Sequence, residues 1–401
     1  MSDLRLERKI VLLAALIQLA SILDFMIIMP LGPNLALALN IPSSDMGILA
    51  GIYTFAAALS GILIAPYLDR YDRKNAAIFF LSGLVVSTFL CTFAWDTYSM
   101  LAARTLAGIF GGPAMALSLA MVIDLVPVER RGRAIAIVTS AFTVSSVFGI
   151  PLALYFSEWF DWKMPFLIIS ILCALIVLGI FKFLPPMVSH IDTTLKVPQK
   201  ISLMSLLRKR EIQLSYGLLS LLSFAQFMLF AGSINYFVFN LDFPREDLGY
   251  IYLVGGVLSF AVMMMTGRVV DQYGARKLSF CVTIIYVFVL ADGFTHTPYM
   301  PVPVIFSLFM MCAAIMGVIC TTIASEAPGD KERAAYMSLQ STSRHLAAGT
   351  GGVFASFILT SNIDNSLNNV EYLGALSIGC IVVLPLIIII LRRELNKKQM
   401  A

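Results

Sequence analysis

Long apolar runs alternate with short polar loops along the whole chain. Twelve of these runs approach the roughly 20 residues that a helix needs to cross the hydrocarbon core of a bilayer. They cover residues 10–38, 46–67, 76–94, 98–125, 134–156, 165–184, 213–240, 248–267, 278–295, 302–324, 336–360 and 372–391. A helix satisfies its own backbone polar groups without water, so each run is predicted to be a membrane-spanning helix.

The composition supports this prediction. The chain is 59% hydrophobic and 13% charged, whereas a soluble domain is about 45–50% apolar and about 25% charged. No soluble core could hide that excess, so we predict an all-α integral membrane protein. The first apolar run extends from Ile10 past Pro30 with no small-residue cleavage site behind it, which distinguishes it from a cleaved signal peptide.

Lysine and arginine are distributed unevenly between the two sides of the predicted membrane. Of these 28 residues, 24 lie at the chain ends and in alternate loops, and the opposite loops hold only Lys163 and Arg245. Cytoplasmic loops are enriched in these residues, so both termini are predicted to be cytoplasmic. The net charge of +4 follows from this bias and does not indicate nucleic-acid binding.

No motif for a metal or a nucleotide accompanies the apolar runs. The six cysteines lie in apolar spans without CxxC spacing and are expected to act as small hydrophobic residues. The stretch GIFGGP at 108–113 has no strand before it and no lysine after it, so it is predicted to permit close helix contact and not to bind phosphate. We therefore expect no metal, no cofactor and no ATP-driven transport.

One charged loop occurs twice. Residues 267–277 are GRVVDQYGARK and residues 65–74 are APYLDRYDRK, so that Asp69 and Asp271 are 202 residues apart, about half the chain. Two parallel six-helix halves related by a pseudo-twofold axis along the membrane normal are therefore predicted, an architecture typical of transporters. The predicted domains are residues 1–184, a cytoplasmic linker at 185–212, and residues 213–401.

GRVVDQYGARK resembles the loop signature of the major facilitator superfamily: a glycine, an aspartate four residues later, then a glycine and a basic pair. In the first copy Ala65 and Asp72 replace the two glycines. Three further stretches resemble features of this family and of its drug and sugar efflux members, namely Arg104 to Gly108, FGIP at 148–151 and DWKMPF at 161–166. The resemblance covers the whole chain and implies the fold of that family.

The resemblance also implies a cytoplasmic gate. The loop aspartate of each half is expected near a helix start in the other half, Asp69 at span 336–360 and Asp271 at span 134–156. A carboxylate is stabilised at a helix N-terminus, so such contacts would hold the cytoplasmic side shut. The alternative is that the loops only enforce a tight turn and topology. The predicted gate residues are Asp69, Arg73, Lys74, Asp271, Arg276 and Lys277.

Two opposite charges are predicted at the same membrane depth. At 1.5 Å per residue, Asp24 lies roughly 22 Å from the cytoplasmic face and Arg104 roughly 10 Å from the outer face. In a core about 30 Å thick these depths coincide, so an ion pair is predicted. A carboxylate whose pairing changes with conformation also changes its proton affinity, as a proton-driven carrier requires. The alternative is a static structural pair.

The eleventh predicted span carries Arg344 and His345, which point about 100° apart, so that one of them is expected to face a cavity. Arg344 could hold an anionic substrate group, and His345 could relay protons near neutral pH. Either residue could instead bond to a neighbouring helix. Hydrogen bonds between helices are an equal alternative for the other polar candidates. The predicted cavity residues are Gln18, Phe25, Asn34, Gln226, Asn235, Gln340 and Arg344, and the predicted proton-coupling residues are Asp24, Arg104 and His345.

The leading hypothesis is a monomeric, proton-coupled antiporter that exports small organic molecules by alternating access. Its expected partners are a small-molecule substrate, protons and the lipid bilayer, and its expected location is a bacterial inner membrane. The nearest alternative is an importer of the same fold for an amino acid, nucleoside or siderophore. A membrane-embedded enzyme or sensor is the remote alternative, because we find no Ser/His or acid cluster at a membrane face.

Overall fold

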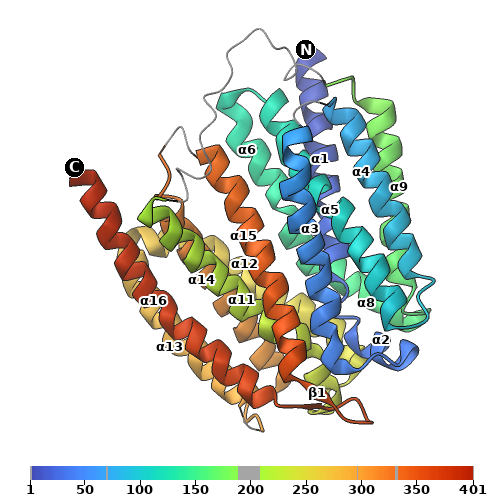
Figure 1. Ribbon diagram of the computed structural model, residues 1–401, viewed down its shortest axis with the longest axis vertical. Helices are drawn as coiled ribbons and strands as arrows, with labels where there is room; N and C mark the ends of the chain where they lie inside the picture. Colours follow the sequence, from blue (N-terminus) through green and yellow to red (C-terminus); the bar gives the residue numbers. More distant parts are fainter. Residues whose placement is uncertain (1, 69–70, 188–207, 296, 330–332, 401) are drawn as a thin grey trace. The chain divides into compact units, whose positions relative to one another are not determined.

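The computed structural model describes the chain except residues 1, 69–70, 188–207, 296, 330–332 and 401. Its internal contacts divide the chain into two compact units. The first unit is Met1–Ile41 with Ile52–Val197, and the second unit is Pro42–Gly51 with Pro198–Ala401. Both are almost entirely helical, as predicted (Figure 1). A short piece of the N-terminal half of the sequence, residues 42–51, therefore packs with the second unit.

In the first unit α4 packs against α5 and α9, and α1 packs against the same two helices (Figure 1). Residues 46–51 of α3 belong to the second unit, and the rest of that helix belongs to the first. The regular helices are α1 (Ser2–Met26), α2 (Gly32–Leu39), α3 (Met46–Leu68), α4 (Arg73–Cys91), α5 (Thr97–Leu125) and α9 (Met164–Phe183).

The prediction of one continuous helix over residues 10–38 is wrong. Helix α1 ends at Met26, a turn follows, and α2 begins at Gly32. Proline has no backbone N–H, so Pro30 and Pro33 cannot donate to the carbonyls four residues earlier. The break leaves carbonyl groups at the end of α1 without partners inside the helix.

The fifth predicted span is also not one regular helix. It consists of four consecutive pieces, and Pro151 in the first turn of the last piece cannot donate to the carbonyl of Val147. A π-helical turn next to this position accommodates the irregularity. The pieces are α6 (Val128–Thr139), α7 (Ala141–Val144), the π-helical η2 (Ser145–Gly149) and α8 (Ile150–Trp159).

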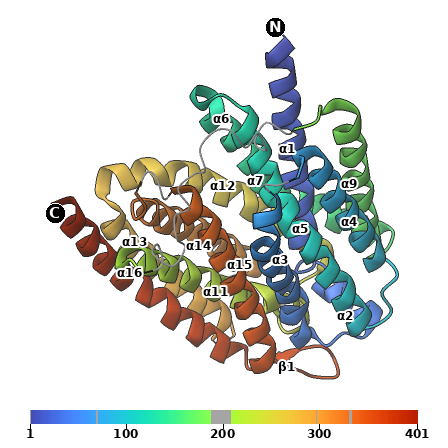
Figure 2. The same cartoon turned by 45° about the horizontal axis from the view of Figure 1, so that its top comes forward.

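In the second unit α11 packs against α14, α15 and α16, and α13 packs against α14 and α16 (Figure 2). A two-stranded antiparallel hairpin joins α15 to α16, with Thr360 opposite Asn368. The elements are η1 (Ser43–Asp45), α11 (Arg210–Phe239), η3 (Arg245–Asp247), α12 (Leu248–Tyr273), α13 (Ala275–Phe294), α14 (Val302–Ala324), α15 (Arg333–Ile358), β1 (Thr360–Ser361), β2 (Leu367–Asn368) and α16 (Val370–Met400).

The two halves of the sequence repeat their local geometry at the predicted offset of 202 residues. Asn40 and Asp242 both adopt the left-handed backbone conformation, with φ of 50° and 51°. The short helices η1 and η3 follow at Ser43 and Arg245, and α3 and α12 begin directly after them. The internal repeat predicted from the sequence is therefore confirmed in the local structure.

Eleven helical stretches of the described residues are long and apolar enough to cross a membrane, judged by length and composition. They correspond to eleven of the twelve predicted spans. The exception is α15, predicted as span 336–360, because its first half is rich in serine, threonine and other polar residues. The membrane span predicted at residues 336–360 and the side on which the termini lie remain predictions.

Helix α5, which carries Arg104, begins at a reciprocal cap. Asp96 Oδ1 accepts a hydrogen bond from the Ser99 backbone N–H at 2.8 Å, and Ser99 Oγ accepts one from the Asp96 N–H at 3.1 Å. These hydrogen bonds lower the pKa of the Asp96 carboxyl below its ordinary value. Such a capping box defines where α5 begins, and therefore the position of Arg104 along the helix.

Candidate functional site

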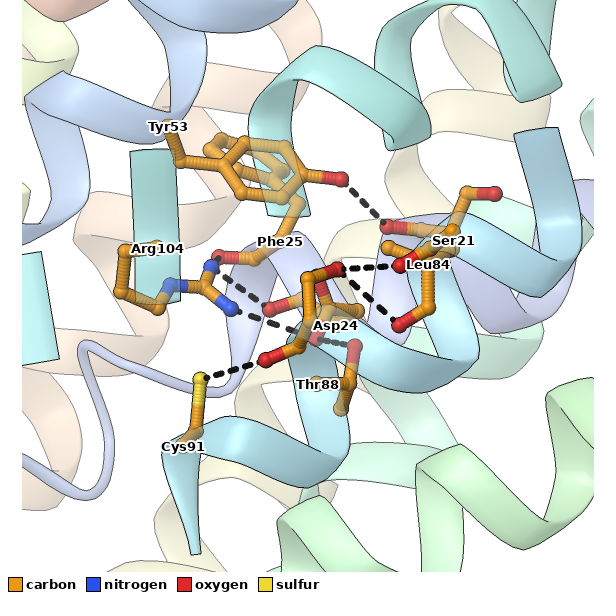
Figure 3. A network of polar contacts seen from close by, with 10 residues as sticks. Ser21, Asp24, Phe25, Tyr53, Leu84, Thr88, Cys91 and Arg104 are labelled. Carbon is orange, nitrogen blue, oxygen red and sulfur yellow. Dashed lines mark hydrogen bonds and ion pairs between the residues drawn. The ribbon is translucent and has the colours of Figure 1, made fainter. Parts of the chain in front are cut away.

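The predicted ion pair between Asp24 and Arg104 is confirmed. Asp24 lies in the last turn of α1 and Arg104 in the second turn of α5, and Arg104 Nη1 is 3.2 Å from Asp24 Oδ1 (Figure 3). Both side chains are fully buried, with 0% of their surface exposed. Two charges removed from solvent in this way must compensate each other, because an unpaired buried charge is strongly unfavourable.

Arg104 also binds the end of the broken helix. Its Nη2 donates to the backbone carbonyl of Asp24 at 2.8 Å and lies 3.5 Å from that of Phe25 (Figure 3). The C-terminal end of a helix carries partial negative charge on such carbonyls, which favours a cation there. The guanidinium therefore stabilises both the carboxylate and the break in α1.

An aromatic side chain that the sequence analysis missed covers the guanidinium. The Tyr53 ring lies 4.6 Å from Arg104 Cζ and 5.5 Å from the Phe25 ring, centre to centre. Cations are attracted to aromatic faces, most strongly where water is excluded. Tyr53 also lies with its hydroxyl 3.5 Å from the Ser21 carbonyl, so it connects α3 to α1 (Figure 3).

The glycine-rich stretch of α5 makes this arrangement possible. A Cβ at Gly108 would lie 2.3 Å from the Tyr53 carbonyl oxygen, and one at Gly111 would lie 2.2 Å from the Tyr53 hydroxyl. At Gly112 it would lie 2.5 Å from the Ala57 carbonyl. The prediction that GIFGGP permits close helix contact is therefore confirmed, with α3 as the neighbouring helix.

Thr88 of α4 is the second residue that the sequence analysis missed. Its hydroxyl donates to Asp24 Oδ1 at 2.8 Å, so α1, α4 and α5 all meet at one carboxylate oxygen (Figure 3). The other oxygen, Asp24 Oδ2, is buried and has no hydrogen-bond partner in the described chain. Arg104 Nε is in the same situation. Buried polar atoms are normally bonded, so these two atoms mark a place where function is expected.

Four of the predicted cavity residues bind neighbouring helices. Gln18 accepts from Ser118 at 2.7 Å and Asn34 donates to Ser157 at 3.0 Å, both in the first unit. In the second unit Gln226 donates to the Ala313 carbonyl at 3.2 Å, and Asn235 donates to Ser43 Oγ at 2.8 Å. These contacts are of the kind given above as the alternative to cavity lining.

The predicted residues of α15 lie differently. Arg344 is exposed, and Gln340 and His345 are half-buried. None of the three forms a hydrogen bond or ion pair with another residue for which the structure gives a position. His345 belongs to the second unit, and Asp24 belongs to the first.

The first copy of the repeated loop is anchored inside its own unit. Arg73 Nε is 3.0 Å from Asp124 Oδ2 of α5. Lys74 Nζ donates to the carbonyls of Phe181 and Leu184 at 3.1 and 2.6 Å, which caps the C-terminal end of α9. Lysine at this end of a helix is favourable for the same reason as Arg104 at the end of α1.

The remaining gate predictions stay untested. Asp69 lies outside the described residues, and so does the side chain of Asp271, whose backbone is in the last turn of α12. Arg276 and Lys277 are exposed in the first turn of α13, and Gly274 before them has φ of 80°. That left-handed conformation suits glycine and explains why the second copy of the loop keeps it.

Segment 42–51 is held against α15 inside the second unit. Ser361 Oγ accepts from the Ser44 backbone N–H at 2.7 Å, and Ser356 Oγ accepts from the Ile48 N–H at 3.0 Å. A Cβ at Gly47 would lie 2.1 Å from the Gly352 carbonyl oxygen, so the two backbones approach closely. No pattern in the sequence predicts this contact.

Within the described part of the chain there is no group of three or more His, Cys, Asp or Glu side chains placed to hold a metal ion. All six cysteines are free thiols, and four of them, Cys91, Cys173, Cys312 and Cys320, are buried. Buried free cysteines generally serve as small apolar side chains.

Comparison with known proteins places these features in a family. The family model of the Major Facilitator Superfamily matches residues 14–352 and 218–398. An uncharacterised MFS-type transporter, YwfA, of Bacillus subtilis (strain 168) is 28% identical over 35% of this chain and 34% of its own length. A probable sugar efflux transporter of Helicobacter acinonychis (strain Sheeba) is 21% identical over 63% of each chain. A chloramphenicol resistance protein of Streptomyces lividans is 22% identical over 62% of this chain and 63% of its own.

The aligned region thus spans about a third of the first of these relatives and just under two thirds of the other two. Solved structures with similar folds include a bacterial homologue of the human lysosomal transporter Spinster in an inward-facing, unoccupied conformation, with a TM-score of 0.77 and 14% identity over 98% of both chains. A D-xylose–proton symporter gives a TM-score of 0.73 and 15% identity over 94% of this chain and 96% of its own.

The family model covers nearly the whole chain, and the related proteins are transporters and not enzymes. The eleven apolar helices agree with a multi-pass integral membrane protein. With the fold, the internal repeat and the charged pair in the first unit, these matches establish that the chain belongs to the major facilitator superfamily.

Proposed function

We propose that this chain is a proton-coupled antiporter that exports small organic molecules, and that Asp24 carries the proton. One observation carries the proposal. Asp24 is a fully buried carboxylate with Oδ1 bound by Arg104 and Thr88 and with Oδ2 unbonded among the described residues. Ionisable groups inside membrane-spanning segments are unfavourable unless they serve a function, and proton relays are a frequent one.

A proton on Asp24 Oδ2 would change the local interactions in a defined way. It would remove the negative charge that balances Arg104, and would turn the carboxylate into a group that can donate as well as accept. Arg104 would keep its contacts with the carbonyls at the end of α1. The proton would therefore alter how α5 and α4 are held to α1, which is the form of coupling that alternating access requires.

Export is the direction that the relatives support. Two of them are named as a probable sugar efflux transporter and a chloramphenicol resistance protein. For this chain we propose an outward flux of an organic molecule in exchange for protons, across a bacterial inner membrane and by a monomer. The cytoplasmic gate, with Asp69, Arg73 and Lys74 of the first loop and Asp271, Arg276 and Lys277 of the second, remains part of the proposal. His345 remains a second candidate for proton transfer.

Everted membrane vesicles test both coupling and direction. With an acidic lumen, the wild type should accumulate radiolabelled chloramphenicol or a labelled sugar against its gradient, as an exporter does; accumulation only in right-side-out vesicles would indicate an importer. Asp24→Asn should lose accumulation driven by the pH gradient and keep exchange of labelled for unlabelled substrate. Asn retains the shape and an acceptor oxygen but cannot titrate.

The matched control is Asp292→Asn. Asp292 is also a buried acid, near the end of α13, but both of its oxygens are bonded, to the backbone N–H groups of Tyr299 and Met300 at 3.2 and 3.1 Å. This variant should keep coupled accumulation. If Asp24→Asn accumulates substrate at the wild-type rate, Asp24 is not the coupling residue, and His345 becomes the next residue to test.

A further inference from the structure

Two arginines lie deep in the helices of this transporter, and their surroundings differ. Arg104 in α5 is fully buried, and Asp24 balances its charge at 3.2 Å. Arg344 in α15 is exposed on the second unit and has no hydrogen bond or ion pair to any residue with a described position. Asp24 therefore neutralises the charge of Arg104, whereas no residue with a described position neutralises that of Arg344.

No carboxylate that the structure describes in the second unit lies at a comparable depth. Arg344 is in the middle third of the 26-residue α15, about 16 Å along the helix from its start. The described acidic side chains of this unit all lie near helix ends or in loops, and they are Asp45, Glu211, Asp242, Glu246, Asp247, Asp292, Glu326, Asp364, Glu371 and Glu394. A charged residue at membrane depth is unfavourable without a partner, and none of these described carboxylates is placed to be the partner of Arg344.

Three further residues share the surface of α15 with Arg344. Met337, Gln340 and Ser341 precede it by seven, four and three positions, the spacings that place side chains on one helix face. Met337 is 61% exposed, Ser341 is exposed and Gln340 is half-buried. We call Met337, Gln340, Ser341 and Arg344 the α15 face. It combines a cation, two neutral hydrogen-bonding groups and one flexible apolar side chain.

We infer that the α15 face binds the carboxylate, phosphate or sulfonate group of an organic anion. The planar guanidinium of Arg344 matches such a group with two parallel hydrogen bonds, which a lysine cannot form. The Gln340 amide and the Ser341 hydroxyl can donate to the same group, and Met337 can adapt to the apolar part of the ligand. The inference rests on the proposed transport function and specifies its substrates as organic anions. An anionic lipid headgroup has the same chemistry and must be distinguished by experiment.

A binding experiment with matched probes tests the inference. The full chain in neutral detergent is titrated with chloramphenicol and its succinate monoester, with glucose and glucuronate, and with uridine and its monophosphate. In at least one pair, the anionic member should bind about tenfold or more tightly than the neutral one. Arg344→Gln should remove that preference, and Arg344→Lys should keep part of it. Arg245→Gln removes an exposed cation at η3, outside the α15 face, and should leave the preference unchanged.

Three results would overturn the inference. One is equal binding of the neutral and anionic members in all three pairs, and the second is an anion preference that survives in Arg344→Gln. The third concerns the source of the anion. In nanodiscs of phosphatidylcholine with or without phosphatidylglycerol, a lipid site would show stabilisation by phosphatidylglycerol that is lost in Arg344→Gln, together with competition between that lipid and the anionic probes. A substrate site would show neither.

The binding experiment separates this inference from the coupling proposal. It is done without a pH gradient, and Asp24→Asn should retain the anion preference because Asp24 belongs to the first unit. If Asp24→Asn uncouples transport while the anion preference is absent, coupling by Asp24 stands and the substrate class is wrong. If the preference depends on Arg344 while Asp24→Asn transports normally, the substrate class stands and the coupling residue lies elsewhere.

Discussion

Helices α1 and α11 occupy the same place in the internal repeat but are built differently. At the offset of 202 residues, Asp24 corresponds to Gln226, and Pro30 and Pro33 correspond to Gly232 and Asn235. Helix α1 ends at Met26 before its two prolines, whereas α11 continues without interruption over 30 residues. The break exposes carbonyl groups that a cation can bind, and α11 has no break at the equivalent position.

The partners of the two helices differ in the same way. Arg104 corresponds by the offset to Phe306, whose ring lies 4.9 Å from that of Tyr252 and 6.4 Å from that of Phe230, centre to centre. Where the first unit has an ion pair, the second has a cluster of aromatic rings and an amide, Gln226, bonded to a backbone carbonyl. Aromatic clusters of this kind stabilise by apolar burial and ring geometry and do not respond to protons.

The comparison suggests a division of roles between the two units. At equivalent places of the repeat, the first unit has a broken helix with an ion pair, and the second has a continuous helix beside aromatic rings. Coupling to protons is then expected in the first unit, and the second unit is expected to contribute substrate recognition from α15.

Removal of Arg104 should have the largest effect. Arg104→Gln leaves the Asp24 carboxylate buried without its counter-ion, which should lower the free energy of unfolding by on the order of 3–5 kcal/mol. The counterpart Phe306→Leu exchanges one apolar side chain for another and should lower it by about 1 kcal/mol. Chemical unfolding in detergent measures both. The double variant Arg104→Gln with Asp24→Asn should recover part of the loss; losses that simply add would show that the two residues do not interact.

Thr88 offers a finer comparison between α4 and α13. Thr88→Val keeps the shape but removes a hydrogen bond to a buried carboxylate, which should destabilise by about 1.5–3 kcal/mol and slow transport. Thr283 of α13 is also buried, but its hydroxyl has no partner among the described residues. Thr283→Val should therefore be neutral or stabilising in the same unfolding assay. Equal effects of the two substitutions would remove Thr88 from the site.

The glycines of α5 and α14 provide the third comparison. A Cβ at Gly108 would lie 2.3 Å from the Tyr53 carbonyl oxygen, whereas one at Gly317 of α14 would meet no atom within 4 Å. Gly108→Ala should push α3 from α5 and destabilise by about 1–3 kcal/mol, with an accompanying loss of transport as Tyr53 moves away from Arg104. Gly317→Ala should stabilise by about 0.5–1 kcal/mol, because alanine favours helix. A neutral Gly108→Ala would mean that the close contact is not needed.

Much of the architecture could be predicted from the sequence, because a chain that crosses lipid must satisfy its backbone polar groups internally and few folds do so. Apolar length predicted eleven of the spans, and charge at equal depth predicted the pair between Asp24 and Arg104. The polar sequence of α15 was less informative, since polarity excludes a lipid-facing surface without indicating which face meets water. The break in α1 was foreseeable from Pro30 and Pro33, since each removes a helical hydrogen bond.

Two residues of the site could not be predicted from the sequence, because tyrosine and threonine are common in membrane-spanning helices. Tyr53 and Thr88 become functional candidates only through their contacts with Arg104 and Asp24, and those contacts depend on helix rotation, which one sequence does not define. Gln18 and Gln226 show the converse limit. The predicted membrane depth of each residue is compatible with lining a cavity and with bonding to a neighbouring helix. In the structure, each of them bonds to a neighbouring helix.

The smallest expected effect concerns the two copies of the charged loop. In the first copy, Arg73 and Lys74 are held by Asp124 and by the end of α9, while in the second copy Arg276 and Lys277 are exposed. If each loop aspartate acts on the dipole of a helix in the other half, Asp271→Asn removes about 0.3–1 kcal/mol of closing free energy, and up to about 2 kcal/mol if that contact is partly buried. Because the first loop has other anchors, Asp69→Asn should have the smaller effect.

A cysteine introduced at Ser341, an exposed position of α15, reports opening of the cytoplasmic side. The measurement is its rate of reaction with a membrane-impermeant maleimide added from that side, after subtraction of labelling at Cys281. The rate should rise severalfold with Asp271→Asn and less with Asp69→Asn. Equal, unchanged rates in both variants at normal expression would reduce the repeated loop to a turn and topology signal.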